Sequence, residues 1–214
     1  MNRTDEPFFR QLLNLICDIL LCNVYFLVCS LPVVTMGAAF SGLYRAMLRL
    51  TRGEGSVTKD FFAGFRSDFW RSTLIWLLLL AVGLGVWADY YFVLAVSGGS
   101  TLVTVLLCVI AFWVAATGTY AFPLLAQFSN KTGRTLRNAM LLSVTNFPRT
   151  LLMAAMSAAI WLVAVFRTEW LYRLAILWLF GGFSVPAYFN SLLLKKIFQP
   201  FLEKPAEKPA EKAE

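Results

Sequence analysis

The sequence contains no histidine and few charged residues. Without histidine, the side chain that most often serves as a general base or metal ligand near neutral pH is missing. Charged residues make up 14% of the 214 residues, whereas soluble domains carry about a quarter. The composition therefore argues against a soluble globular protein.

The cysteines form no pair suited to metal binding or redox chemistry. All of them lie inside apolar segments and none belongs to a Cys-x-x-Cys motif: Cys17, Cys22, Cys29 and Cys108. A buried cysteine behaves as a small hydrophobic residue. The sequence also lacks a Gly-rich phosphate loop, paired carboxylates at mid-membrane depth and a serine with an adjacent base. We therefore expect a non-enzymatic protein with no catalytic residue, no metal and no cofactor.

Long apolar segments dominate the sequence. Hydrophobic residues make up 59% of it, and the mean hydropathy is +0.68. Six blocks approach the roughly 20 residues that a transmembrane helix requires. They are 12–31, 33–48, 73–96, 101–128, 150–166 and 170–194. The pattern predicts one all-α polytopic transmembrane helical bundle over residues 1–200.

The second block and the C-terminal residues need separate interpretations. Block 33–48 is short and carries Arg45, so the chain has five spans if this block is re-entrant or lies flat. Residues 201–214 alternate Glu and Lys and contain Pro205 and Pro209. This composition predicts a disordered, solvated tail.

The basic residues predict the orientation of the spans. The net charge of +7 arises at the ends of apolar blocks, where Lys and Arg set topology and meet anionic lipid. Basic connections follow the second, fourth and sixth blocks, whereas Leu31–Pro32 and 97–100 carry no basic residue. This alternation predicts an even number of spans with both termini in the cytoplasm. It favours a lipid bilayer, and not nucleic acid, as the partner of the positive charge.

Both long basic connections have helical periodicity. The apolar positions of the first are Val57, Phe61, Phe62, Phe65 and Phe69, and those of the second are Leu136, Met140, Leu141, Val144 and Phe147. Such segments are typical of amphipathic helices at a membrane surface. The alternative is a docking surface for a cytoplasmic partner, and we favour the membrane surface.

A weak internal repeat connects these two regions. Residues 68–72 read Asp-Phe-Trp-Arg-Ser, and residues 146–150, 78 positions later, read Asn-Phe-Pro-Arg-Thr. In both places an amphipathic segment leads into an apolar block. The second and third blocks are therefore predicted to be related to the fourth and fifth.

Polar residues inside apolar blocks are candidates for function. Asn14 and Asp18 are four positions apart and share a helical face, and Asn23 and Asn190 are further candidates. Asn14, Asp18 and Asn190 lie toward the predicted inner ends of their blocks, whereas Asn23 lies deeper, and a structural role is the favoured interpretation. Small residues form a separate pattern that permits close helix packing, within the chain or between subunits: Gly37, Ala38, Ser41 and Gly42.

One set of motif residues points to a known family. It comprises Asn23, Leu31, Pro32, Thr35, Gly37, Ala38, Arg52, Glu54, Gly55, Phe61, Phe62, Phe65, Arg66, Phe69, Ser72 and Thr73. This set resembles the signature of the YesL-like bacterial membrane proteins, which are classed as a domain of unknown function. The resemblance covers residues 23–73 and extends to about residue 200. The family more often has Asn where this chain has Asp68.

The resemblance implies a location and a class of partner. Members of the family are small polytopic proteins of Gram-positive and related bacteria, often found near carbohydrate ABC importers and glycan-degrading enzymes. It implies a multi-pass protein of the bacterial cytoplasmic membrane that serves as an accessory or assembly subunit of such an importer. The partners would be permease subunits or a second copy of this chain. No catalytic residue is established for the family.

Two alternatives remain open. The repeat, together with Asp18 and Asn23, would suit a transporter or permease in its own right. The cytoplasmic Glu-Ala-Ala loop of ABC permeases is missing, since the nearest stretch, Arg137–Ala139, lacks the acid. A membrane sensor or regulator is the other alternative, but the sequence contains no signalling domain.

Overall fold

All secondary structure that the computed structural model describes is helical, as predicted. The described residues are 8–97, 100–128, 131–166, 179 and 181–203. The elements are α1 (Phe8–Ser30), the 3₁₀ helix η2 (Val33–Thr35), α2 (Met36–Leu50), α3 (Val57–Ser67), α4 (Phe69–Ser97), α5 (Thr101–Gln127), α6 (Thr132–Thr145), α7 (Phe147–Phe166) and α9 (Ser184–Glu203).

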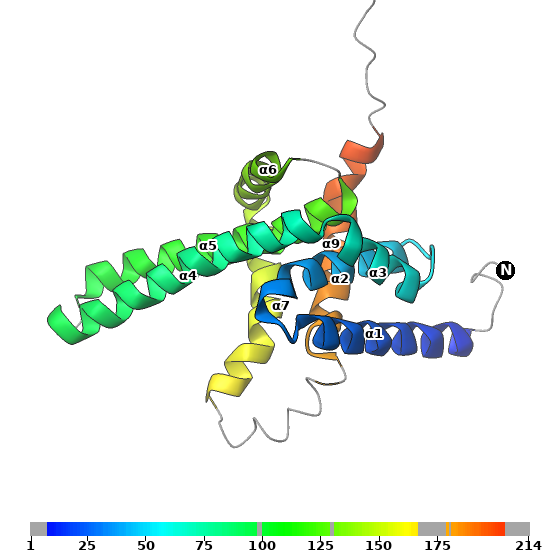
Figure 1. Cartoon of the computed structure of the whole chain (residues 1–214), viewed down its shortest axis with the longest axis horizontal. Helices are drawn as coiled ribbons and strands as arrows, with labels where there is room; N and C mark the ends of the chain where they lie inside the picture. Colours follow the sequence, from blue (N-terminus) through cyan, green and yellow to red (C-terminus); the bar gives the residue numbers. More distant parts are fainter. Residues whose placement is uncertain (1–7, 98–99, 129–130, 167–178, 180, 204–214) are drawn as a thin grey trace, which may run out of the picture.

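Helix α2 lies at the centre of the molecule (Figure 1). It packs against α1, α3, α4, α5 and α9, and 11 of its 15 residues are buried. Fifteen helical residues extend about 22 Å, which is less than the roughly 30 Å of a bilayer core. The predicted span at 33–48 corresponds to this short core helix and the preceding η2, and it is not confirmed as a membrane span.

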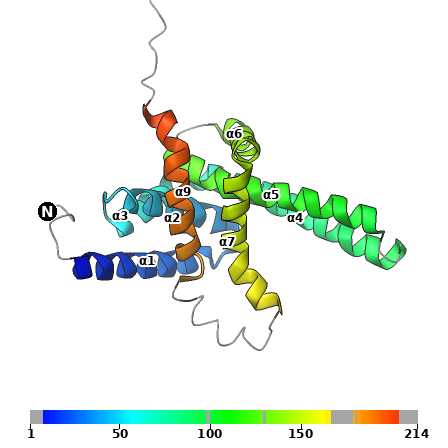
Figure 2. The ribbon, with the colours of Figure 1, turned by 180° about the vertical axis from the view of Figure 1, so that it is seen from behind.

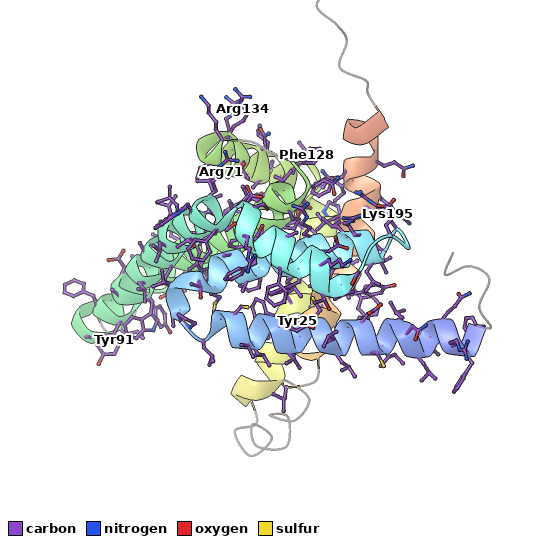
Figure 3. The ribbon with its side chains drawn as sticks, turned by 45° about the vertical axis from the view of Figure 1, so that its right-hand side comes forward. Tyr25, Arg71, Tyr91, Phe128, Arg134 and Lys195 are labelled. Atoms are coloured by element: carbon purple, nitrogen blue, oxygen red, sulfur yellow. The ribbon has the colours of Figure 1, made fainter. Side chains whose placement is uncertain are left out.

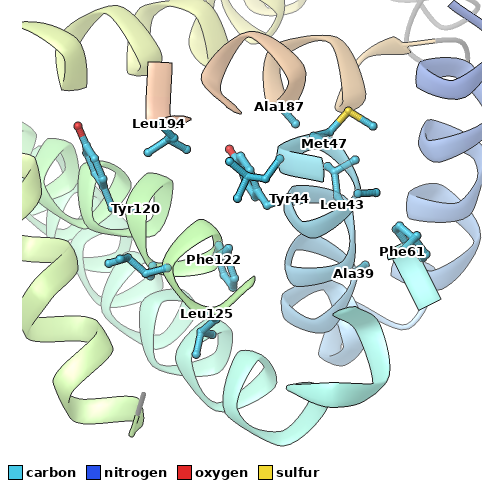
Figure 4. Packing of buried hydrophobic residues seen from close by; sticks show 14 of the residues in the cluster. Ala39, Leu43, Tyr44, Met47, Phe61, Tyr120, Phe122, Leu125, Ala187 and Leu194 are labelled. Atoms are coloured by element: carbon cyan, nitrogen blue, oxygen red, sulfur yellow. The ribbon is translucent and has the colours of Figure 1, made fainter. Parts of the chain in front are cut away.

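Figure 4 shows how this core is built. Leu43 and Met47 of α2 lie near Ala187 of α9. Phe61 of α3 lies beside α2. All four side chains are at most 3% exposed. The core thus joins segments from both halves of the sequence around α2.

Three helices in the described part of the chain are long and apolar enough to cross a membrane. They are α1, α4 over Phe69–Ala95, and α5, and most of their apolar segments are not buried within the protein. They correspond to the predicted spans 12–31, 73–96 and 101–128. This finding makes the chain a membrane-type helical protein but does not confirm six spans.

The helices do not form one parallel bundle. In Figures 1 and 2, the antiparallel α4–α5 hairpin projects from the core on one side and α1 projects on the opposite side. Helices α7 and α9 run across both directions. The arrangement differs from the predicted bundle because the short α2, and not a set of full-length spans, organises the packing.

The sixth predicted block is not one continuous helix. Residues 170–178 and 180 lie outside the described residues, and the helix is interrupted by a turn at Gly182–Phe183. Helix α9 begins only at Ser184 and runs to Glu203, beyond the predicted end at residue 194. Of the predicted tail at 201–214, residues 204–214 lie outside the described residues.

Helices form at both predicted amphipathic segments, but their apolar faces differ. Phe61 of α3 is fully buried and α3 packs on α2, so its apolar face contacts protein. Met140, Leu141 and Val144 of α6 are more than half exposed. Phe62 of α3 is 37% exposed, so only part of its apolar face is buried, and the predicted membrane-surface role is not confirmed for α3.

The predicted internal repeat is visible in the backbone. Asp68 separates α3 from α4 with φ −121° and ψ 23°, and Asn146 separates α6 from α7 with φ −113° and ψ 40°. The amide of Ser72 donates to the Asp68 carbonyl at 2.8 Å, and that of Thr150 donates to the Asn146 carbonyl at 2.9 Å. The sequence similarity therefore marks the same helix–break–helix junction twice.

Candidate functional site: an arginine-lined cavity

A basic cavity lies where the α4–α5 hairpin joins the core. Its volume is about 710 Å³, and its lining comes from α2, α3, the start of α4 and the end of α5. Arginine is its most frequent lining residue: Arg45, Arg49, Arg52, Arg66 and Arg71. Glu54 and Asp68 are the lining carboxylates, so positive charge prevails.

Local sequence explains why the arginines meet. Arg45 and Arg49 are four positions apart and lie on one face of α2, and Arg52 follows in the turn after the end of this helix at Leu50. Gly53 and Gly55, with φ of 74° and 75°, then reverse the chain so that α3 returns along α2. These left-handed conformations are readily accessible to glycine. The turn thereby brings Arg66, near the end of α3, to the same cavity.

The arginines are only partly neutralised. Arg49 Nη1 forms an ion pair with Asp60 Oδ1 at 2.6 Å, and Arg71 Nη1 lies 3.6 Å from Asp68 Oδ1. Arg52 donates to Gln127 Oε1 at 3.0 Å, and Arg45 donates to the Ser67 hydroxyl at 3.4 Å. Within the described ranges, Arg45, Arg52 and Arg66 have no carboxylate partner.

The cavity lies at one end of the hairpin. Figure 3 shows Arg71 and Phe128 near the core end of α4 and α5, and Tyr91 at the far end. The charged lining is thus separated from the hairpin turn by the length of two apolar helices.

Asn23, a predicted intramembrane polar residue, is a helix cap. It is fully buried, and its Oδ1 accepts hydrogen bonds from the amides of Phe183 and Ser184 at 3.1 and 3.2 Å and from the Ser184 hydroxyl at 3.2 Å. Its Nδ2 donates to the Leu179 carbonyl at 2.8 Å. These contacts satisfy backbone groups at the start of α9 that no helical hydrogen bond can satisfy. Asn23 thereby connects α1 to α9.

The other predicted polar residues do not gather into one site. Asn190 is buried and its Nδ2 donates to Ser157 Oγ at 3.2 Å and to the Tyr44 hydroxyl at 3.5 Å. Asn14 is exposed and Asp18 is half-buried on α1. None of the four predicted polar residues lines the arginine cavity.

The glycines predicted to permit close packing do so inside the protein. A Cβ at Gly37 would overlap the Ser72 carbonyl oxygen and the Trp76 side chain. A Cβ at Gly42 would lie 2.7 Å from the Phe61 carbonyl oxygen. The small-residue face is therefore occupied by α3 and α4 and is not free for a second subunit.

The remaining motif residues also support local structure. Thr35 Oγ1 donates to the carbonyls of Cys29 and Pro32 at 2.7 and 2.8 Å, which fixes the turn after Leu31. The ring of Phe65 stacks on that of Phe61 with a centroid distance of 6.4 Å and meets that of Phe69 edge to face at 5.5 Å. Ala38 is fully buried in α2, and Gly55 approaches the Asp60 carboxylate. In the part of the chain that the structure describes, no three His, Cys, Asp or Glu side chains lie together as metal ligands would.

Comparison with known proteins identifies the segment that contains these features. Residues 19–90 match DUF624, a family described as "Protein of unknown function". The family resemblance is confirmed over this segment. The DUF624 segment begins within α1 and ends within α4, so it contains α2, α3 and all the arginines of the cavity.

A curated relative extends the comparison. The uncharacterized protein YteU of Bacillus subtilis (strain 168) is 23% identical over 145 residues, or 67% of this chain and 65% of the relative. The match thus spans slightly less than two thirds of the relative's length. No solved structure matches the chain.

One feature of the sequence indicates part of the cavity lining. The spacing of Arg45 and Arg49 indicates an arginine face on one helix, in addition to the contribution of these residues to topology. Nothing in the sequence shows that Arg66 and Arg71 face the same space, because that depends on how α3 and α4 pack against α2.

Proposed function

We propose that the chain is a non-enzymatic accessory or assembly subunit of a carbohydrate ABC import system in the bacterial cytoplasmic membrane. The proposal places several spans in the bilayer and both termini in the cytoplasm. Three long apolar helices support the membrane location. The family resemblance suggests the class of system, and the permease subunit is the proposed partner.

The exposed apolar face of α6 is the observation that carries this proposal. Met140, Leu141 and Val144 are 53%, 55% and 57% exposed, while Ala139 and Ser143 on the other side of the helix are buried. Helix α6 thus presents large apolar side chains away from the protein. Such a face is suited to packing against a helix of a partner subunit.

The buried polar residues favour an accessory role over transport. Asn23 is engaged in capping α9, and Asn190 hydrogen-bonds to Ser157 and Tyr44. A transport pathway requires polar groups that converge on a substrate. In this chain the two buried asparagines instead join helices to one another.

Affinity purification tests the proposal. A tagged full chain would be isolated from native bacterial membranes in a mild detergent, and co-purifying proteins identified by mass spectrometry. A carbohydrate permease subunit is expected with the wild type and absent with Leu141→Glu. Arg137→Glu, a charge change at an exposed position of the same helix, is the control and should retain the subunit. Absence of the permease from the wild-type preparation, or its retention by Leu141→Glu, would overturn the proposal.

A further inference from the structure

We propose that the arginine-lined cavity binds the phosphate group of an anionic ligand. A phospholipid headgroup and a small soluble phosphate compound share this chemistry. The inference concerns a ligand of the cavity and does not depend on the permease interaction.

The guanidinium groups that have no carboxylate partner supply the recognition chemistry. Arg45 of α2, Arg52 of the turn after α2 and Arg66 of α3 converge on the cavity without a carboxylate partner in the described chain. A guanidinium group presents a planar fork of N–H donors that matches phosphate oxygens and forms charge-assisted hydrogen bonds with them. A phosphate in the cavity would supply the negative charge that Glu54 and Asp68 supply only in part.

Arg49 differs from Arg45, Arg52 and Arg66 because its charge is already neutralised by a carboxylate. It already pairs with the buried Asp60 at 2.6 Å, and this contact attaches α3 to α2. The ion pair therefore holds the wall of the cavity, while the neighbouring arginines remain available to a ligand.

The size of the cavity suits more than a bare ion. Its volume of about 710 Å³ is within the range of roughly 300–1,000 Å³ that is typical of small-molecule sites. Leu125, Ala126 and Phe128 supply an apolar part of the lining beside the arginines. A headgroup with adjoining glycerol would match this combination.

The position of the cavity favours lipid as the source of the phosphate. It lies at the core end of two helices long and apolar enough to cross a membrane. Lipid phosphates are concentrated where such helices leave the hydrocarbon region. Trp70, which also lines the cavity, is 81% exposed, and tryptophan is enriched at that depth.

A purely topological role for the arginines makes a different prediction. Arginines that only orient the spans would respond to the sum of nearby charge, without dependence on which residues are changed. A binding site depends on the arginines that line it. Arg134 and Arg137 of α6 are exposed, lie outside the cavity lining and provide the matched comparison.

Thermal unfolding of the full chain in a neutral detergent tests the inference. The midpoint would be measured with short-chain phosphatidylglycerol, short-chain phosphatidylcholine or inorganic phosphate added. The variants are Arg45→Gln/Arg66→Gln in the cavity and Arg134→Gln/Arg137→Gln outside it. Titration of the ligand gives an apparent affinity for each protein, and native mass spectrometry of the lipid complex gives a second readout that does not depend on stability.

We expect phosphatidylglycerol to raise the midpoint of the wild type and of the α6 variant alike. The cavity variant should bind it about tenfold or more weakly, because it lacks two charge-assisted contacts. Stabilisation by phosphatidylglycerol alone identifies a lipid headgroup, and equal stabilisation by inorganic phosphate identifies a free phosphate compound. The inference is overturned if no anion stabilises the wild type, or if both double variants lose binding to the same extent. If the cavity variant does not fold, Arg66→Gln alone replaces it, and the loss of one charge-assisted contact should weaken binding about threefold or more.

Discussion

Asn23 shows how one side chain can connect distant parts of this chain. It is fully buried on α1, yet its amide group satisfies both a carbonyl at Leu179 and the first amides of α9. A polar side chain in an apolar helix is costly to bury unless all its groups are paired. Asn23 therefore has a structural role, and its partners lie more than 150 positions away in the sequence.

Replacing Asn23 by alanine should destabilise the protein by about 2–3 kcal/mol, because the buried backbone groups at the start of α9 would lose their partners. Urea or SDS unfolding in detergent micelles, followed by circular dichroism, measures the change. Asn14→Ala, at an exposed position of the same helix, serves as the control. Equal stability of Asn23→Ala and the wild type would show that the cap contributes nothing.

Gly37 and Gly85 form a second matched pair. A methyl group at Gly37 would overlap the backbone of α4, whereas nothing lies within 4 Å of a Cβ at Gly85. Gly37→Ala should therefore cost about 1–3 kcal/mol through overpacking. Gly85→Ala should be neutral or stabilising by up to about 1 kcal/mol, since alanine is the better helix former. The same unfolding assay measures the stability of both variants. Equal effects of the two substitutions would contradict the packing of α2 on α4.

At the scale of elements, α3 is held to α2 by one strong ion pair as well as by apolar packing. Asp60→Asn should weaken this attachment by about 1–2 kcal/mol, because Arg49 loses a short, charge-assisted contact. Hydrogen–deuterium exchange of the α3 amides would report faster local opening. Asp68→Asn is the control, since its contact with Arg71 is 3.6 Å and half-exposed and should contribute less than about 0.5 kcal/mol. Unchanged exchange of α3 in Asp60→Asn would disprove the role of the pair.

The sequence predicts most helices because helical periodicity and apolar length are local properties. The segments that became α1, α4, α5 and α7 were each expected within a few residues, and the repeat at Asp68 and Asn146 marks equivalent junctions. The burial of α2 was not predicted, because a short apolar helix with Arg45 resembles a weak span. What distinguishes it is contact with helices from both halves of the chain, which periodicity does not encode.

The candidate site could likewise be predicted from the sequence only where it depends on local spacing. The arginine face of α2 can be derived from residue spacing alone, whereas its meeting with Arg66 and Arg71 depends on the Gly53–Gly55 turn and on the packing of α3 and α4. Likewise, the role of Asn23 depends on α9 and has no signal near position 23. Local patterns thus indicate which residues are unusual, and tertiary contacts decide what they do.

At the scale of the whole molecule, the charge and the apolar surface are separated along the α4–α5 hairpin. The arginine cavity lies at its core end, and the end of α4 at Ser97 and the start of α5 at Thr101 lie at the other. We therefore expect the hairpin to cross the membrane and the arginines to lie on the cytoplasmic side, where positive charge is retained.

Cysteine accessibility in intact cells tests this central claim most directly. The four native cysteines would first be replaced by alanine. Ser100→Cys would then be introduced at the hairpin turn and Lys131→Cys beyond the inner end of α5. We predict that a membrane-impermeant maleimide labels the Ser100→Cys variant in intact cells and the Lys131→Cys variant only after permeabilisation. Labelling of both variants from the outside, or of Lys131→Cys alone, would contradict the account.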